Sequence, residues 1–445
     1  MVESNHLFFN FEGQENLPIA DRGQGIYLYD TDGSRYLDGS SQAFAAILGH
    51  GNRDIKKAIV HQFEKVDFVH RFEFLNSPAA ELANMIYSKT GGRFSRLFYA
   101  SSGSEAVDTA LKLAYYYHFA ANNGTRWKII SRVPGFHGAT MGALSVTADY
   151  GRNHPYGIYN HDFPKISAPY CYRCPYDLEP ESCALKCTNE LERVIELYGK
   201  NSISAFICES IGGTPTGAIQ PPEGYYERIR AICNHYGILW IDDEVLTGYG
   251  RTGKFLAVDW WDAKPDIITV SKGISGGYLP LAAVLCQEEL FQKTLGSGGF
   301  NHGHTQSANP LCCAVGMEVL KILEKKNLIE NCLVQGERLG QALADLKRQF
   351  KIIGDIRGKG LLWGMEFVRD RKTKDPFPKR LNVAKKLKEI CRDNGLSLFS
   401  SNPIDGVKGD CVIIAPPLII KGHEIDELAE ILEKSLASLS DLLKQ

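Results

Sequence analysis

A lysine follows directly after a short apolar segment, in the string DIITVSKG at 266–273. A lysine at the end of a buried strand loses solvation, and its pKa then falls. The neutral amine that results can form a Schiff base with a carbonyl compound. Most lysines are ordinary surface residues, so Lys272 needs partners before this chemistry is assigned to it.

Carboxylates follow a second apolar segment, in IDDEV at 241–245. In open α/β folds, ligands bind in the crevice at the carboxyl ends of the strands. The pattern therefore places an anion, Asp243, where a ligand could meet it. The alternative is a solvated loop start.

Small residues open an expected helix in YASSGSEA at 99–106. A helix start exposes backbone N–H groups, and the helix dipole favours an anion there. Ser102, Gly103 and Ser104 are therefore candidates for a phosphate cradle. An ordinary serine N-cap would leave the same pattern.

An aromatic side chain between glycines occurs in GFHG at 135–138, where Phe136 could approach a flat ligand face-on or simply pack in a loop. Taken together, the four strings supply an anion cradle, a flat aromatic, a carboxylate and a lysine. This is the set that pyridoxal phosphate requires for its phosphate, its ring, its ring nitrogen and its aldehyde.

Short apolar segments rich in β-branched or aromatic residues alternate with amphipathic ones through the middle of the chain. They predict strands buried on both faces, and the run at 104–121 predicts a helix with Val107, Leu111, Ala114 and Tyr117 or His118 on one face. Alternating β and α elements predict an α/β domain with a mostly parallel sheet. The expected strands lie at 127–131, 205–209, 238–242, 266–271 and 283–286.

The two ends of the chain have a different pattern. Residues 25–39 alternate like a small antiparallel ribbon, and 328–445 combine long amphipathic helices with strand-like 361–367 and 411–417. We therefore expect a smaller α+β domain built from both ends, with limits at 1–60 and 328–445. The large domain would then span 61–327.

The composition excludes several classes of protein. The chain has 445 residues, 44% of them hydrophobic, and a formal net charge of -2, which is not the basic signature of a nucleic-acid-binding protein. It has no apolar run near the ~20 residues that span a bilayer. The first residues lack the pattern of a secretory signal, and the twelve cysteines are expected to be reduced thiols in a cytoplasmic protein.

The sequence resembles the class III, or ω-, aminotransferases of the fold-type I pyridoxal-phosphate enzymes. The most specific stretches are LWIDDEVLTGYGRTGKF at 239–255 and PDIITVSKGISGGYLPLAAV at 265–284, and NHGHTQSANPL at 301–311 resembles the family's threonine segment. The likeness implies a homodimer with shared active sites, with a tetramer left open. It also implies a ping-pong transfer from an amine donor to a 2-oxo acid.

The resemblance also implies residue roles. Lys272 would bind the cofactor covalently and shuttle the proton, and Asp243 would pair with the pyridine nitrogen. Val245 and Phe136 would pack on the two ring faces, although Phe136 replaces the family's commoner tyrosine. The remaining cofactor residues would be Ser102, Gly103 and Ser104 at the phosphate, His137 and Glu209 nearby, and Thr305 at the neighbouring subunit's phosphate.

Departures from the family bear on the substrate. The strand-like segment CVIIAPP at 411–417 lacks the arginine that binds an α-carboxylate in many relatives, and Phe399 stands near the place of a mobile arginine in others. Lys408 is a candidate point charge, and Phe44 a candidate pocket aromatic. Thr214 replaces a second glutamate of ornithine and γ-aminobutyrate relatives. We therefore expect an ω-amine or small amino donor, with pyruvate or a similar acceptor.

Two alternatives remain. A racemase, epimerase or decarboxylating relative would use the same lysine but need no 2-oxo acid acceptor. A non-enzymatic protein that binds the cofactor is the third hypothesis.

Four cysteines have the spacing C-x2-C-x8-C-x3-C, which can hold tetrahedral zinc. A thiol-rich insertion without metal and a redox-sensitive pair are the alternatives. His302 and His304 also suggest a metal, but the threonine segment explains them better. The four cysteines are Cys171, Cys174, Cys183 and Cys187.

Overall fold

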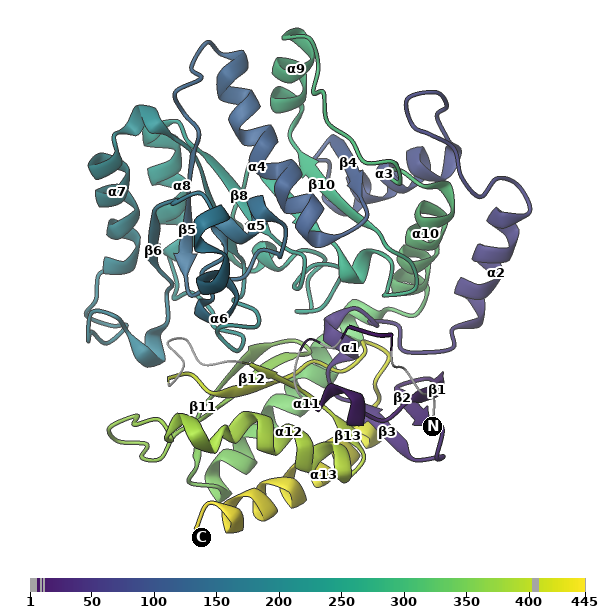
Figure 1. The fold of residues 1–445 in the computed structure, drawn as a ribbon, viewed down its shortest axis with the longest axis vertical. Helices are drawn as coiled ribbons and strands as arrows, with labels where there is room; N and C mark the ends of the chain where they lie inside the picture. The colour runs from purple at the N-terminus through teal and green to yellow at the C-terminus, as the bar shows by residue number, and fades with distance from the viewer. Residues whose placement is uncertain (1–5, 9, 11–12, 402–407, 445) are drawn as a thin grey trace.

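The structure is a computed structural model that describes residues 6–8, 10, 13–401 and 408–444. Its central element is a seven-stranded sheet with the strand order β4-β10-β9-β8-β7-β5-β6. Figure 1 shows this sheet and its helices in the upper half of the molecule, with the segments from both ends of the chain below.

The central sheet is mixed, with one antiparallel strand. β10 runs antiparallel to both of its neighbours, while β5 to β9 pair in parallel. Every residue of β7, β8, β9 and β10 is buried, which confirms the strands predicted to be covered on both faces. The bounds are β4 (Arg96–Ala100), β5 (Lys128–Val133), β6 (Lys165–Ser167), β7 (Ile203–Glu209), β8 (Leu239–Asp243), β9 (Ile267–Val270) and β10 (Ala282–Cys286).

Helices cover the two faces of this sheet. α4 (Gly103–Ala120) buries Val107, Leu111, Ala114 and His118 as its periodicity predicts, and it packs on the face that carries Ile241. α8 (Tyr225–Tyr236) packs on the opposite face, where Tyr226 stacks on Trp240 at 5.3 Å between ring centroids. The other long helices of this part are α2 (Arg53–Phe63), α3 (Ser77–Lys89), α7 (Lys186–Tyr198), α9 (Glu288–Gly296) and α10 (Pro310–Lys325).

The ends of the chain form two four-stranded sheets, and strands from both ends meet in the first of them. β13 (Leu396–Ser397) pairs in parallel with β3 (Arg35–Asp38), which joins the C-terminal segment to the N-terminal ribbon of β1 (Ala20–Gln24) and β2 (Tyr27–Asp30). The second sheet has the order β11-β12-β15-β14. Its strands are β11 (Ile353–Lys359), β12 (Leu362–Phe367), β14 (Phe399–Ser401) and β15 (Cys411–Ile414), flanked by α11 (Leu328–Gln349), α12 (Val383–Asp393) and α13 (Gly422–Leu442).

The domain limits at 60/61 and 327/328 stay a prediction, but a buried arginine shows how the two halves are joined. Arg251 donates to the carbonyls of Leu361 (3.1 Å) and Pro416 (2.6 Å) and to the Ser41 hydroxyl (2.9 Å). A planar guanidinium with several donors can hold such separated acceptors at once. Arg251 therefore fixes the short α1 (Ser41–Phe44), whose four residues are all left-handed, against the large domain.

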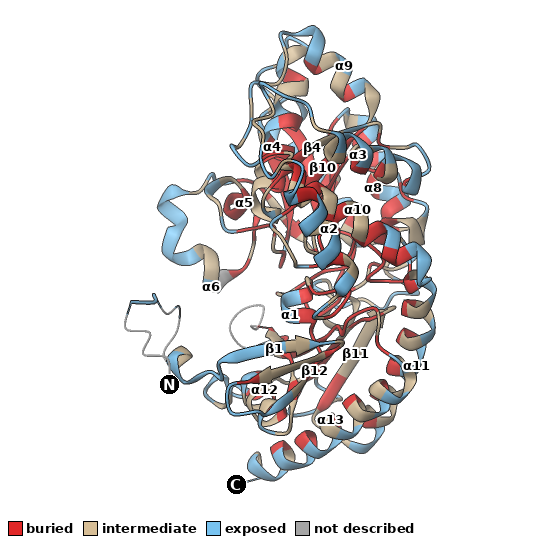
Figure 2. Ribbon diagram, turned by 90° about the vertical axis from the view of Figure 1, so that its right-hand side faces the viewer, coloured by how far each residue is buried: buried red, intermediate tan, exposed pale blue. Residues whose placement is uncertain are grey.

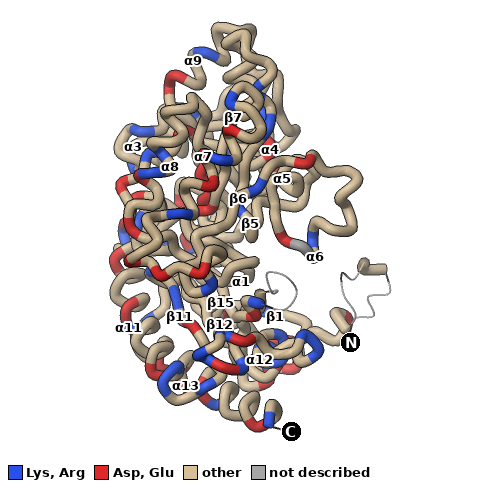
Figure 3. Tube along the Cα trace, turned by 90° about the vertical axis from the view of Figure 1, so that its left-hand side faces the viewer, with Lys and Arg blue, Asp and Glu red and all other residues tan. Residues whose placement is uncertain are grey.

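Two side views (Figure 2 and Figure 3) show where the buried residues and the charged residues lie. Figure 2 shows buried residues along β10, while α6 (Tyr150–Asn153) stands away from the sheet beside α5 (Met141–Val146), whose last four residues are buried. Figure 3 shows basic and acidic residues interspersed along the chain. Among the described residues, no helix is long and apolar enough to cross a membrane.

Candidate active site

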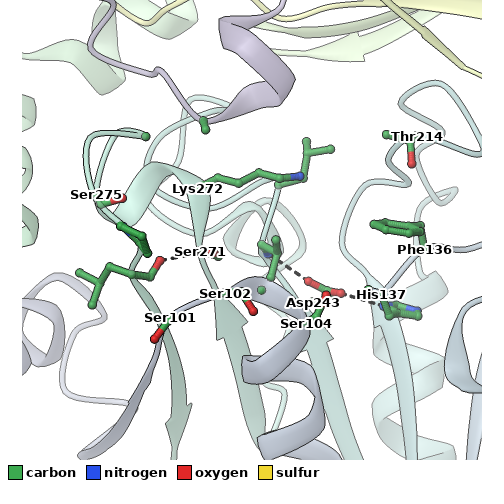
Figure 4. Close-up of a pocket in the computed structure, with 18 of the residues that line it drawn as sticks. Ser101, Ser102, Ser104, Phe136, His137, Thr214, Asp243, Ser271, Lys272 and Ser275 are labelled. Atoms are coloured by element: carbon green, nitrogen blue, oxygen red, sulfur yellow. Dashed lines mark hydrogen bonds and ion pairs between the residues drawn. The ribbon is translucent and has the colours of Figure 1, made fainter. Parts of the chain in front are cut away.

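A cavity of about 460 Å³ lies at the carboxyl ends of β7, β8 and β9, next to the start of α4. Most of the predicted cofactor residues line it, and Figure 4 shows ten of its residues labelled. The four sequence strings are therefore brought to one place, as expected for the crevice of an open α/β sheet. The predicted residues in its wall are Ser102, Gly103, Ser104, Phe136, His137, Glu209, Asp243, Val245 and Lys272.

Lys272 enters the cavity directly after β9. Its backbone is left-handed (φ 48°), a conformation that non-glycine residues adopt only where the surroundings impose it. Its ammonium nitrogen lies 5.2 Å from the ring centroid of Phe44. Loss of solvent lowers the pKa of Lys272 to about 8, so roughly a tenth of the side chains carry a neutral amine at pH 7. A neutral amine is the form that attacks a carbonyl.

Asp243 is buried at the end of β8 and is held by three donors. Oδ1 accepts from the Val245 N–H at 3.0 Å and from the Thr269 hydroxyl at 3.2 Å. Oδ2 lies 2.8 Å from Nδ1 of His137, the contact drawn in Figure 4. Nε2 of His137 is buried and has no protein partner. The donors fix the orientation of the carboxylate beside the cavity.

The start of α4 fits a phosphate. Ser102 caps the helix by accepting the Glu105 N–H at 3.2 Å, so the helix begins at Gly103. A Cβ on Gly103 would lie 2.9 Å from Cγ1 of Val245, which explains the glycine. The first N–H groups of a helix have no partner within it, and together with the dipole they favour an anion.

Phe136 and Glu209 complete the wall opposite Lys272. The Glu209 carboxylate accepts the N–H groups of Gly213 (2.8 Å) and Phe136 (3.2 Å), which ties the aromatic to the end of β7. Burial raises the pKa of Glu209. The guanidinium of Arg152 lies 4.3 Å from the Phe136 ring centroid. The residues present thus fit pyridoxal phosphate: a lysine, an anion, an aromatic wall and an anion cradle face one cavity.

The predicted substrate residues lie at different distances from this cavity. Phe44 contacts Lys272 and also packs against Phe399, with ring centroids 5.1 Å apart. Phe399 lines a separate cavity beside α12 and is not part of the wall of the first cavity. Lys408 is exposed and does not line the cavity, and it adjoins 402–407, which lie outside the described residues.

Thr305 is exposed and does not line the cavity of its own chain. Its contact with a second subunit stays a prediction. The neighbouring His302 lies 2.8 Å from the Thr109 hydroxyl and 2.9 Å from the Lys112 ammonium, which accounts for its ring without a metal.

Sequence reasoning missed several residues of the cavity. Thr214 was noted only as a replaced glutamate, but its hydroxyl is buried at the cavity without a protein partner. Ser271, Ser275 and Tyr278 also line the cavity. The serines flank Lys272 in the sequence, so proximity to the lysine was the available signal.

The four clustered cysteines line one very small cavity near α7. In the described part of the chain, no group of three or more histidine, cysteine or acidic side chains is arranged to hold a metal. Burial raises the pKa of the Cys187 thiol to about 12. The zinc and redox alternatives for the four cysteines stay predictions.

Known proteins resemble the chain over nearly its whole length. The family model for class III aminotransferases matches residues 10–436. An uncharacterized aminotransferase of Bacillus subtilis, YodT, is 38% identical over 96% of this chain and 97% of its own. The adenosylmethionine-8-amino-7-oxononanoate aminotransferase of Methanocaldococcus jannaschii is 34% identical over 94% and 92%.

Solved structures agree with the sequence matches. An (S)-enantioselective ω-transaminase from Thermomicrobium roseum superposes with a TM-score of 0.91 at 34% identity, covering 98% of this chain and 96% of that one. A transaminase obtained by ancestral reconstruction gives a TM-score of 0.93 at 30% identity, with coverage of 98% and 97%. The predicted fold is thereby confirmed.

Proposed function

The chain belongs to the class III aminotransferases, which use pyridoxal phosphate, and we propose that it moves an amino group from an amine or ω-amino compound to a 2-oxo acid such as pyruvate. The reaction would be ping-pong, because the cavity near Lys272 can serve the donor and then the acceptor. The bound cofactor supplies an electron sink that acidifies the substrate carbon.

The residues of the cavity divide the remaining work. The Lys272 amine would take the proton from the substrate carbon as a general base. As a general acid it would then return this proton to the carbon on the other side of the amino nitrogen. Asp243, oriented by His137, would hold the ring nitrogen and keep it protonated. The start of α4 would hold the phosphate, and Phe136 would limit movement of the ring.

The observation that supports an amine donor is the apolar wall behind Phe44. Ile413 occupies the strand position where many relatives have an arginine, and it is fully buried in a cluster with Phe44, Leu246 and Ala415. A carboxylate placed there would lose its water without gaining a charged partner, which is costly. An apolar substituent would instead gain from burial.

The acceptor still needs a partner for its carboxylate, and Arg152 is the candidate. Its guanidinium covers the face of Phe136, and its charge lowers the pKa of Lys272, so it is close enough to the cavity to act on it. Its ion pair with Asp149 is long, at 3.5 Å, and its side chain is 40% exposed. The guanidinium can therefore turn toward an incoming anion.

A second copy of the chain is part of the proposal. Phe72, Phe74 and Leu75 are large apolar residues with 67%, 63% and 96% of their surface exposed. Phe72 lies against Gly303, two residues before Thr305. Exposed apolar residues beside the segment expected to reach a neighbouring phosphate favour a homodimer with shared sites.

The donor class is tested by comparing arylalkyl or aliphatic amines with α-amino acids at saturating pyruvate. We expect kcat/KM for the amines to exceed that for α-amino acids of similar size, other than alanine, by about 10- to 100-fold, the range of one lost charge-assisted pair. A preference for α-amino acids would overturn the proposed donor class.

Replacing Arg152 with glutamine tests the acceptor site. We expect KM for pyruvate to rise about 10-fold or more, while KM for an uncharged amine donor changes less than about twofold. Arg228→Gln is the matched control, since Arg228 is exposed on α8 and does not line the cavity. An unchanged KM for pyruvate in Arg152→Gln would show that another group binds the acceptor.

A further inference from the structure

Behind Asp243, two more carboxyl groups are buried on the other side of β8. Side chains alternate along a strand, so Asp242 faces away from the cavity, toward the layer that contains Tyr226 and Trp240. Asp242 and Glu244 are both fully buried. The reaction derived above does not use either of them, and burying two carboxylates side by side is costly.

A single hydroxyl group joins the two carboxyls. Oγ of Ser210, the residue after β7, lies 2.6 Å from Oδ2 of Asp242 and 3.1 Å from Oε1 of Glu244. A serine hydroxyl has one hydrogen to donate. If both carboxyls were ionised, one of these contacts would place oxygen lone pairs against each other. The geometry therefore requires one more proton, carried by one of the two carboxyls.

The surroundings identify the carboxyl that carries this proton. Glu244 is well supplied with donors, since Oε2 accepts the Thr247 hydroxyl at 2.5 Å and Oε1 accepts the Val258 N–H at 2.7 Å. Oδ1 of Asp242 is buried with no protein partner, which suits a neutral carbonyl oxygen better than half of a carboxylate. Donors stabilise an ionised group, so Glu244 is the anion.

The neighbouring strands and helix also carry charged and titratable groups. The buried Arg132 on β5 donates to the backbone carbonyl of Glu209 and favours ionisation of Asp242, but burial and the charge of Glu244 outweigh it and raise the pKa of Asp242 well above its ordinary value. Asp243 acts in the same direction as Glu244. From α8, the Tyr226 hydroxyl donates to the Ser210 carbonyl at 2.7 Å and fixes this residue.

We propose that Asp242, Ser210 and Glu244 form a carboxylic acid–hydroxyl–carboxylate chain in which the proton resides on Asp242 at neutral pH. Asp242 donates to Ser210, and Ser210 donates to Glu244. This hydrogen-bonded chain links the end of β7 to the segment from Glu244 to Val258, with Asp243 held between them. These three residues are positioning residues for Asp243, and a neutral Asp242 spares it a further negative neighbour.

Asparagine and glutamine variants of the cofactor-loaded protein test which group holds the proton. The amide of Asp242→Asn can donate to Ser210 as the neutral acid does, so we expect the melting temperature to be kept or raised at pH 8. Glu244→Gln places an amide donor against groups that already donate, so we expect the melting temperature of this variant to fall by at least about 2 °C. If Glu244→Gln kept the wild-type melting temperature while Asp242→Asn lost it, the assignment of the proton to Asp242 would be overturned.

The pH dependence of stability is a second measurement, and a purely structural role of Asp242 would not change it. The folded protein holds the Asp242 proton that the unfolded chain releases above about pH 4, so the contribution of Asp242 to wild-type stability falls as pH rises above that value. Asp242→Asn lacks this slope. We therefore expect the melting temperature of Asp242→Asn, relative to that of the wild type, to increase between pH 5 and pH 8. A difference between the two melting temperatures that does not change with pH would contradict the proposal.

Infrared spectra locate the proton directly, and cofactor retention tests the positioning. The C=O band of a buried carboxylic acid should be present in the wild type and absent from Asp242→Asn; its absence from the wild type would overturn the proposal. Asp242→Ala should lose cofactor faster than wild type on dialysis, and Asp242→Asn should restore retention. Equal loss from both variants would contradict the positioning role.

Discussion

Replacing Lys272 with alanine is expected to lower kcat by at least about 10⁴-fold, because, in the proposed mechanism, the change removes both the covalent attachment of the cofactor and the amine that moves the substrate proton. Steady-state turnover of the preferred amine with pyruvate measures the loss. Lys254→Ala is the matched control, since Lys254 is exposed and does not line the cavity.

Chemical rescue separates the role of Lys272 from a structural one. Small primary amines that fit the emptied space should restore part of the activity of Lys272→Ala, with rates that follow the basicity of the amine. If Lys272→Ala kept more than about a tenth of the wild-type kcat, Lys272 would not be the residue that moves the proton. The same would follow if added amines failed to restore activity to the folded fraction of this variant.

Replacing Asp243 with asparagine should have the second-largest effect. The neutral amide keeps contacts with Val245 and Thr269 but loses the charge that, in the proposed mechanism, holds a proton on the ring nitrogen, which would weaken the electron sink. A fall in kcat on the order of 10²- to 10³-fold is expected, the size of one lost preorganised electrostatic contact. KM for the donor should change much less.

The control for Asp243→Asn is Asp262→Asn. Asp262 is exposed and left-handed (φ 45°), a conformation that asparagine tolerates. Its kinetics should match the wild type. If Asp243→Asn were as active as this control, the anion at the ring nitrogen would have to come from another residue.

The sequence predicted the central sheet well because its strands are short, apolar and buried on both faces. β7, β8, β9 and β10 all fall within two residues of their predicted bounds. β4 was not foreseen, because its first residues RLF are partly exposed and the string was read only for the helix that follows. β11 was missed for a similar reason, since five of its seven residues are only half-buried.

The candidate site was predictable where its residues stand at the ends of recognisable strands. Asp243 ends β8, Lys272 and the start of α4 come just after strands, and all three meet at one edge of the sheet. Arg152 was not foreseen, because it reaches Phe136 from a short helix that no motif marks. The link from Asp242 through Ser210 depends on the pairing of β7 with β8, which no local pattern specifies.

The most direct test of transamination is a single half-reaction with known amounts of cofactor-loaded protein. An amine donor added without acceptor should release about one equivalent of its carbonyl product per active site and then stop. Pyruvate should restart the reaction and appear as alanine, which places the amino group on the enzyme between the two steps. Racemisation of an amino acid without carbonyl release or need for pyruvate would contradict this account and establish an epimerase.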